Sequence, residues 1–126
     1  MTRRIILAIK NPFVHAVGHP TGRLIGRRKP YDVDIDTVIE TAKEYGKALE
    51  VNSNYLRLDL NDKHIRKAVE SGVKIIISTD AHGTDQLGMM RLGISTARRG
   101  WAEKKDVINS LDWGELESWL KSVRHQ

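Results

Sequence analysis

Three short runs of apolar residues recur along the chain, and glycine, proline or asparagine bounds each of them. The runs span residues 13–19, 48–52 and 73–80. Runs of this length that are rich in β-branched residues are typical of buried strands. Because the runs are nearly continuous rather than alternating, they favour parallel strands that are covered on both faces. We therefore predict three parallel strands at these positions.

Segments with helical spacing of apolar residues separate and follow these runs. We predict helices over residues 2–10, 34–45, 61–72, 85–93, 104–111 and 113–123. A residue that can cap a helix stands before the second of them (Asp34 or Asp36) and before the third (Asn61 or Asp62), and a glycine follows each. The alternation of helix and strand predicts an α/β fold with a parallel sheet.

Composition narrows the class of protein further. A length of 126 residues fits one domain, and we treat residues 1–126 as such. The absence of cysteine excludes disulfide scaffolds and thiolate chemistry. No apolar run approaches the roughly 20 residues that a membrane span needs, and the N-terminus has no signal-like apolar segment, so we expect a cytoplasmic protein. The net charge of +5 permits phosphate-bearing partners without requiring them.

Polar and ionisable residues gather where the three predicted strands end. His19 follows the first strand, Glu50 and Asn52 end the second, and Asp80 and His82 end the third. The carboxyl ends of parallel strands meet at one rim, where α/β folds place their sites. Imidazole and carboxylate groups together suit Zn²⁺, Mn²⁺ or Fe²⁺. The pattern thus predicts a metal or catalytic site, although a capping aspartate beside a surface histidine would give the same Asp-x-His pair.

Basic residues follow the first strand directly, in a predicted loop over residues 22–31. This loop contains Arg23, Arg27, Arg28 and Lys29. The fork of an arginine side chain matches the geometry of phosphate, so we predict that Arg23 and, more weakly, Arg27 contact a phosphorylated substrate or a nucleic-acid backbone. The competing interpretation of such a run is a solvated surface.

The remaining histidines and one further aspartate complete the candidates. Asp85 follows His82 closely and begins the next predicted helix, from where it could also orient a metal ligand. His15, His64 and His125 lie near a strand start, in a helix and in the tail, respectively, and we do not expect them to be ligands.

Four segments carry a family resemblance: residues 19–28, 48–62, 78–82 and 93–101. They resemble the PHP (polymerase and histidinol phosphatase) domain, in the version found at the C-terminus of bacterial and archaeal family X DNA polymerases. The resemblance covers nearly the whole chain. It implies a distorted (β/α)7 barrel with Mn²⁺ or Zn²⁺ at the C-terminal rim. It also implies phosphoester hydrolysis, which in the polymerase-linked version is 3′–5′ exonuclease and related DNA end processing.

The resemblance also implies roles for individual residues. His19 matches a histidine ligand, and Asp80 and His82 match the last ligand pair and the catalytic centre. Glu50 and Asn52 match rim positions that support ligands rather than bind metal. The His-x-His pair of the family's first strand has no counterpart here. We therefore expect a partial barrel of about three strands, and a partner or a missing N-terminal half to complete it.

Three functions remain open on this basis. The leading hypothesis is a metal-dependent phosphoesterase fragment that acts on DNA ends when the barrel is complete. The second is a non-catalytic module that forms homo-oligomers through open sheet edges, because half a barrel leaves strand edges and apolar surface exposed. The third is a small-molecule phosphatase like the histidinol-phosphate branch, which the polymerase-type motifs and the basic loop make less favoured.

Overall fold

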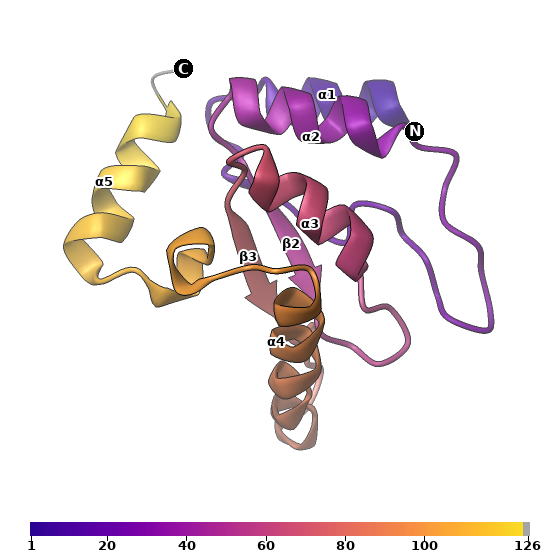
Figure 1. Cartoon of the computed structure of the whole chain (residues 1–126). Helices are drawn as coiled ribbons and strands as arrows, with labels where there is room; N and C mark the ends of the chain where they lie inside the picture. Colours follow the sequence, from indigo (N-terminus) through magenta and orange to yellow (C-terminus); the bar gives the residue numbers. More distant parts are fainter. Residues whose placement is uncertain (125–126) are drawn as a thin grey trace.

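The computed structural model describes residues 1–124, and its three strands form one parallel sheet in the order β1-β2-β3. Figure 1 labels β2 and β3, the two longer strands. The strands are β1 (Ala16–Val17), β2 (Ala48–Asn52) and β3 (Ile75–Ser78). Val17 pairs with Leu49 across the first interface, and Asn52 pairs with Ser78 at the end of the second. The predicted α/β class and the parallel pairing of the three strands are confirmed.

Helices separate and follow the strands as the spacing of apolar residues predicted. They are α1 (Thr2–Ile9), α2 (Ile35–Glu44), α3 (Asp62–Glu70), α4 (Met90–Arg99) and α5 (Trp113–Arg124), with 3₁₀ helices η1 (Thr84–Met89), η2 (Lys104–Asp106) and η3 (Ile108–Ser110). The side chain of Asp34 accepts from the Thr37 N–H at 3.1 Å and that of Asn61 from the His64 N–H at 2.9 Å, so these two residues are the caps. No helix in residues 1–124 is long and apolar enough to cross a membrane.

Two predicted elements differ from the structure near the N-terminus and in the tail. The first apolar run forms only the two-residue strand β1, because its early part is not buried: Phe13 is 77% exposed. The segment 104–111 forms the two short 3₁₀ helices η2 and η3 instead of one helix.

The predicted end of a helix at Gly93 is wrong, because α4 continues to Arg99. A Cβ atom at this position would lie 1.9 Å from Ser53 Oγ and 2.7 Å from Ile77 Cγ2. The glycine therefore allows the helix to approach the sheet closely, and it does not end the helix.

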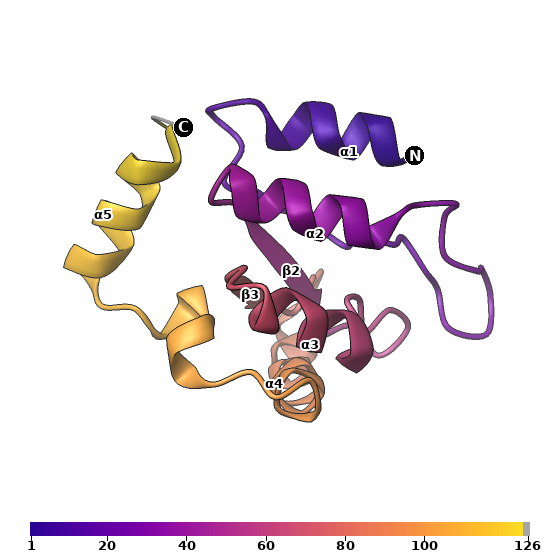
Figure 2. The same ribbon diagram turned by 45° about the horizontal axis from the view of Figure 1, so that its top comes forward.

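The helical layer covers one face of the sheet, with α2 and α3 over the strands and α1 against α2 (Figures 1 and 2). The buried core on this side combines sheet and helix residues: Leu49, Val51, Ile75, Ile77, Val38, Ile39, Ala42, Ile65 and Ala68. The opposite face carries Glu50, Ile76 and Ser78, which are half-buried. The core thus leaves one face of the strands, and their carboxyl ends, for polar groups.

The outer edge of β3 is occupied by the segment that follows α4. The Ile77 N–H donates to Asn109 Oδ1 at 2.8 Å, and Asn109 Nδ2 donates to the Ile77 carbonyl at 2.9 Å. Ile75 also forms an isolated parallel bridge with Val107. Within the described residues the sheet is therefore an open, three-stranded one whose β3 edge is already paired.

Lys47 is the largest fully buried side chain, at 1% exposure, just before β2. Its Nζ donates to the Val123 carbonyl at 3.0 Å and to the Asn11 carbonyl at 3.3 Å. A lysine that donates to the last carbonyls of a helix also suits the helix dipole. Burial lowers the pKa of Lys47. This side chain therefore ties α5 and the segment after α1 to the start of the sheet.

We expect Lys47→Met to lower the free energy of unfolding by about 1–3 kcal/mol, because two carbonyls lose their donor. Since the folded pKa of Lys47 lies below its unfolded value of 10.5, this group adds stability as pH rises through the folded pKa toward 10.5. Urea unfolding between pH 7 and about 10 should show the gap between wild type and variant widening. Exposed Lys43→Met is the control. An unchanged gap would contradict the assignment.

Candidate functional site

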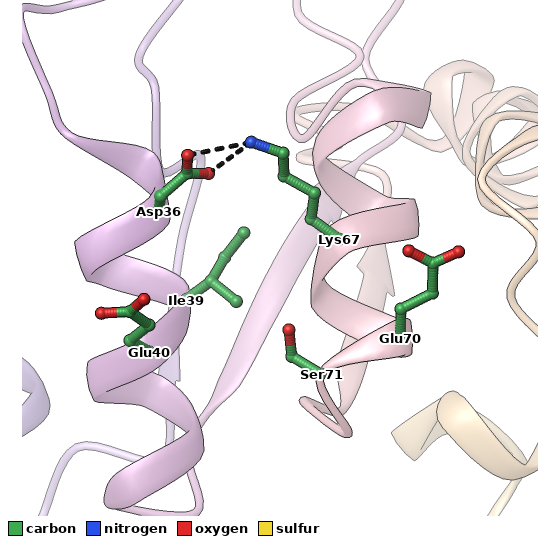
Figure 3. A pocket seen from close by; sticks show the side chains of 6 residues that line it. All are labelled: Asp36, Ile39, Glu40, Lys67, Glu70 and Ser71. Carbon is green, nitrogen blue, oxygen red and sulfur yellow. Dashed lines mark hydrogen bonds and ion pairs between the residues drawn. The ribbon is translucent and has the colours of Figure 1, made fainter.

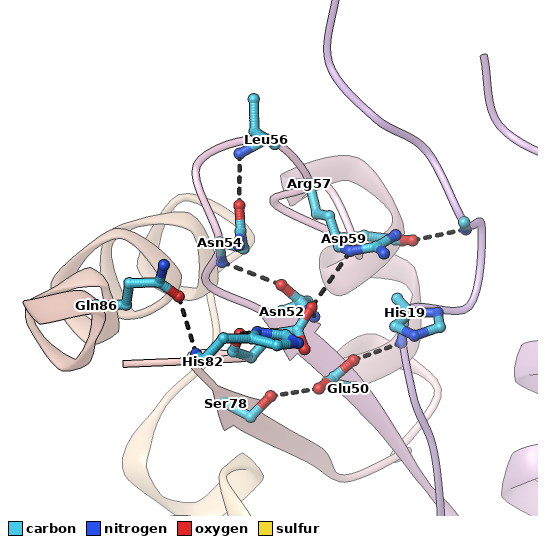
Figure 4. Close-up of polar contacts among 12 residues, drawn as sticks. His19, Glu50, Asn52, Asn54, Leu56, Arg57, Asp59, Ser78, His82 and Gln86 are labelled. Atoms are coloured by element: carbon cyan, nitrogen blue, oxygen red, sulfur yellow. Dashed lines mark hydrogen bonds and ion pairs between the residues drawn. The ribbon is translucent and has the colours of Figure 1, made fainter. Parts of the chain in front are cut away.

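The carboxylate of Glu50 joins the ends of all three strands (Figure 4). One of its oxygens accepts from the backbone N–H of His19, after β1, and the other from the hydroxyl of Ser78, at the end of β3. His19 has a φ of 28°, which a non-glycine residue rarely adopts. The strand ends therefore converge as predicted, and Glu50 holds the backbone of His19 in an unfavoured conformation.

We expect Glu50→Ala to lower the free energy of unfolding by about 1–3 kcal/mol and to speed amide hydrogen exchange at His19, because that N–H loses its acceptor. Chemical denaturation and NMR-detected exchange measure the two effects. Exposed Glu40→Ala, on α2, is the matched control. If exchange at His19 stays at the wild-type rate, Glu50 does not hold this backbone.

Asp80 lies at the same rim and has two side-chain neighbours. Its Oδ2 accepts from Asn52 Nδ2 at 3.2 Å and lies 3.4 Å from Arg57 Nε. Its φ of 53° also falls in the left-handed region. Asn52 therefore contacts the Asp80 carboxylate, and its predicted support of a metal ligand stays a prediction.

His82 is exposed and its ring has a defined orientation. Its Nδ1 lies 2.8 Å from the Asp80 carbonyl oxygen, and its backbone N–H donates to Gln86 Oε1 at 2.9 Å (Figure 4). Because a carbonyl oxygen can only accept, Nδ1 is the donor in this contact, and in the neutral ring Nε2 then carries the lone pair. A histidine that donates through one ring nitrogen to a backbone carbonyl is prepared to bind a metal through the other.

The donors at the rim fit a divalent cation in kind. His19 and His82 offer imidazole nitrogens and Asp80 offers a carboxylate, which is the mixture that Zn²⁺ and Mn²⁺ accept. Within residues 1–124, however, no three His, Asp or Glu side chains lie together as a complete metal site. The described rim therefore presents donors of the right type but not a closed set of ligands.

Asp59, which we did not single out from the sequence, organises the entrance to the basic loop. Its buried carboxylate accepts from the Thr21 N–H at 3.0 Å and from the Gly22 N–H at 2.8 Å. Burial raises the pKa of Asp59, against the lowering effect of these hydrogen bonds. An aspartate between two leucines, Leu58 and Leu60, was the signal in the sequence that a carboxylate is buried here.

The structure places Arg23 against the chain itself. Its Nε donates to the Arg57 carbonyl at 2.6 Å, and its Nη2 donates to the Leu58 carbonyl. Arg23 therefore fastens the basic loop to the loop between β2 and α3. Its predicted contact with phosphate stays a prediction, as does that of Arg27, which is exposed and has no ion-pair partner among the described residues.

Arg28, also in the basic loop, is engaged in a similar way. Its Nη2 donates to the Gly22 carbonyl at 2.7 Å, and its guanidinium carbon lies 5.2 Å from the centre of the Tyr31 ring. Gly22 has a φ of 63°, and a Cβ atom there would lie 1.9 Å from the Tyr31 ring. Arg23 and Arg28, two of the four basic residues, thus bind backbone carbonyls and stabilise the loop. The positive charge of the loop in the sequence does not reveal this structural role.

The other candidates lie in surroundings unlike the rim. The His15 ring packs 6.1 Å from the Trp119 ring, and His64 is half-buried in α3, where burial lowers its pKa. His125 lies outside the described residues. Asp85 is exposed in η1, and the residue of that helix that bonds to His82 is Gln86. The predicted role of Asp85 toward a ligand stays a prediction.

A surface hollow lies between α2 and α3, in the helical layer (Figure 3). It is lined by Asp36, Ile39, Glu40, Lys67, Glu70 and Ser71. Lys67 Nζ crosses it to Asp36 at 2.7 Å and 2.9 Å from the two carboxylate oxygens. None of these residues belongs to the rim, so the hollow is separate from the candidate site.

No family model matches the chain. It is 46% identical over 119 residues, or 94% of its length, to the DNA polymerase/3′-5′ exonuclease PolX of Bacillus subtilis, 21% of which the match covers. It is also 32% identical over 131 aligned positions, or 99% of its length, to a probable phosphatase of Thermoanaerobacter sp. (strain X514), 51% of which is covered. A probable phosphatase of Caldanaerobacter subterraneus subsp. tengcongensis is 39% identical over 87 residues.

The chain thus spans about a fifth of the exonuclease and about half of the first of these phosphatases. Both kinds of relative have names that denote cleavage of phosphoester bonds. The similarity covers nearly all of the chain, including the ends of the three strands.

Proposed function

We propose that this chain is a C-terminal portion of a PHP-type phosphoesterase domain that processes DNA ends with the help of divalent metal ions. The observation that carries the proposal is the rim itself, where Glu50 joins the end of β1, at His19, to the end of β3, at Ser78, and where the Asp80 carbonyl orients the His82 ring (Figure 4). The 46% identity to an exonuclease over 94% of the chain supports the same reading.

In this proposal His19, Asp80 and His82 hold Mn²⁺ or Zn²⁺, and Asp80 and His82 are also the catalytic residues. A bound divalent ion supplies an activated water and neutralises phosphate charge. Glu50 keeps His19 in place through its backbone N–H, while Asn52 orients the Asp80 carboxylate. Further ligands come from a chain segment beyond these 126 residues or from a second copy, because the described rim lacks a complete set.

DNA is favoured over small molecules as the substrate by two features of the chain. The identity to the exonuclease is 46%, against 32% to the first phosphatase, and the basic loop of residues 22–31 follows His19 directly. The small-molecule alternative is supported by the phosphatases themselves, one of which matches over 99% of the chain. The oligomerisation alternative is restricted to the β1 side of the sheet, since Asn109 and Val107 occupy the β3 edge.

The test is hydrolysis with Mn²⁺ by this chain together with the segment or second copy that completes its rim, using a 3′-labelled oligonucleotide and p-nitrophenyl phosphate in parallel. We expect Mn²⁺-dependent release of nucleotides that is lost in Asp80→Asn. Cleavage of p-nitrophenyl phosphate alone would favour the small-molecule phosphatase. Inactivity on both substrates, together with a stable dimer, would favour the non-catalytic module.

A further inference from the structure

Arg57 is the arginine that lies at the rim, on the loop between β2 and α3. Its Nε is 3.4 Å from Asp80 Oδ2, and its side chain is only 21% exposed (Figure 4). Its Nη1 is buried and has no hydrogen-bond partner among the described residues. A largely buried guanidinium with an unsatisfied donor, beside the proposed catalytic centre, needs an explanation.

The backbone around Arg57 is fixed from several sides. Its N–H donates to the Asn54 carbonyl at 2.8 Å, and its own carbonyl accepts from Arg23 Nε at 2.6 Å. The next carbonyl, that of Leu58, accepts from Arg23 Nη2. The Arg23 guanidinium is therefore bonded to the backbone beside Arg57 and fixes its position. The Arg57 guanidinium, in contrast, lies at the rim beside Asp80.

The contact with Asp80 uses only some of the N–H donors of the Arg57 guanidinium. An arginine offers five N–H donors, and arginine–carboxylate pairs are frequently bidentate at 2.7–2.9 Å. Here one nitrogen faces Asp80 Oδ2 at 3.4 Å, and the same oxygen also accepts from Asn52. The geometry is therefore looser than that of a dedicated ion pair, and it leaves donors for a second anion.

We propose that Arg57 binds a phosphate group of the substrate at this rim. The proposal rests on the proposed function for the presence of a phosphoester, but the contact itself needs no metal ion. Phosphate is the ligand whose oxygens match the planar fork of arginine, and it is the group that a phosphoesterase must hold. Asp80 competes for Arg57 while its carboxylate is free, so the two anions are coupled through this one cation.

The coupling gives a test in the absence of metal. Orthophosphate is titrated into the full chain in the presence of EDTA, by calorimetry or by the NMR signal of Arg57 Nε–H. We expect Asp80→Asn to bind orthophosphate at least about tenfold more tightly than wild type, since it removes a competing negative charge. The gain should vanish in Asp80→Asn/Arg57→Ala and be partly kept in Asp80→Asn/Arg57→Lys.

Asp80→Asn/Arg4→Ala is the matched control, because it removes one exposed positive charge from α1, away from the rim and the basic loop. It should keep the gain. Equal affinities for Asp80→Asn with and without Arg57, or loss of the gain only in the Arg4 variant, would overturn the proposal. Thermal melts of each variant separate loss of binding from loss of fold. No turnover occurs in this experiment, so its outcome is distinguishable from a failure of the proposed enzymatic function.

Discussion

Replacing Asp80 with alanine should weaken the binding of Mn²⁺ by at least about 100-fold. Its carboxylate is the one anionic ligand among the three proposed, and loss of even a supporting hydrogen bond typically costs 10–100-fold in metal affinity. The measurement is competition between the chain and a chromogenic chelator at pH 7. Because Asn52 and Arg57 both face the Asp80 carboxylate, the change also removes the hydrogen bond and ion pair that they form with it.

The matched control for this experiment is Glu44→Ala, which removes an exposed carboxylate of α2 that lies outside the rim. It should keep the Mn²⁺ affinity within about twofold of wild type, as expected for a distant screened charge. If Asp80→Ala keeps the wild-type Mn²⁺ affinity, Asp80 is not a metal ligand. If both variants bind Mn²⁺ more weakly than wild type by the same factor, the chain attracts the cation through its overall charge and not through Asp80.

The second large effect is expected for Asp59→Ala, which should lower the free energy of unfolding by about 2–4 kcal/mol. It leaves the buried N–H groups of Thr21 and Gly22 without their acceptor, at about 1–3 kcal/mol each. The loop of residues 22–31 loses its anchor at the same time. Trypsin should therefore cut at Arg23 to Lys29 faster in the variant, and urea unfolding should report the lost stability.

The pH dependence of this effect has a defined sign. Burial raises the folded pKa of Asp59 above its unfolded value of 3.8, so its contribution to stability is complete below pH 3.8 and falls as pH rises through the folded pKa. The stability gap between wild type and Asp59→Ala should therefore narrow from acidic to neutral pH. Asp36→Ala, an exposed ion-pair change, should cost at most about 1 kcal/mol. A gap that widens toward neutral pH would contradict the assignment.

The strands and helices could be predicted where the spacing of apolar residues was regular or a capping residue marked the start of a helix. The cap at Asn61 and the run from Ala48 to Asn52 are examples, since local hydrogen bonding and burial alone decide them. Gly93 shows the limit of such reasoning. A glycine that ends a helix and one that permits close packing look alike in a sequence, and only the contact with Ser53 and Ile77 distinguishes them.

The rim was predictable in outline because the ends of parallel strands must converge, which brings His19 and Ser78 to Glu50, and Asp80 to Asn52. The different roles of the arginines could not be predicted from the sequence. Arg23 binds carbonyls that are 34 and 35 residues away in the sequence. The sequence of the basic loop therefore predicted a phosphate site. In the structure, one of its arginines, Arg23, binds the backbone of the loop between β2 and α3 and positions Arg57.

The central claim is that the rim of this chain binds a divalent metal ion through His19, Asp80 and His82. Equilibrium dialysis of the purified chain against Mn²⁺ or Zn²⁺, followed by elemental analysis, tests it most directly. We predict about one ion retained per wild-type chain and loss of that ion in Asp80→Ala. Retention of no ion by the wild-type chain, or equal retention by both, would contradict the claim.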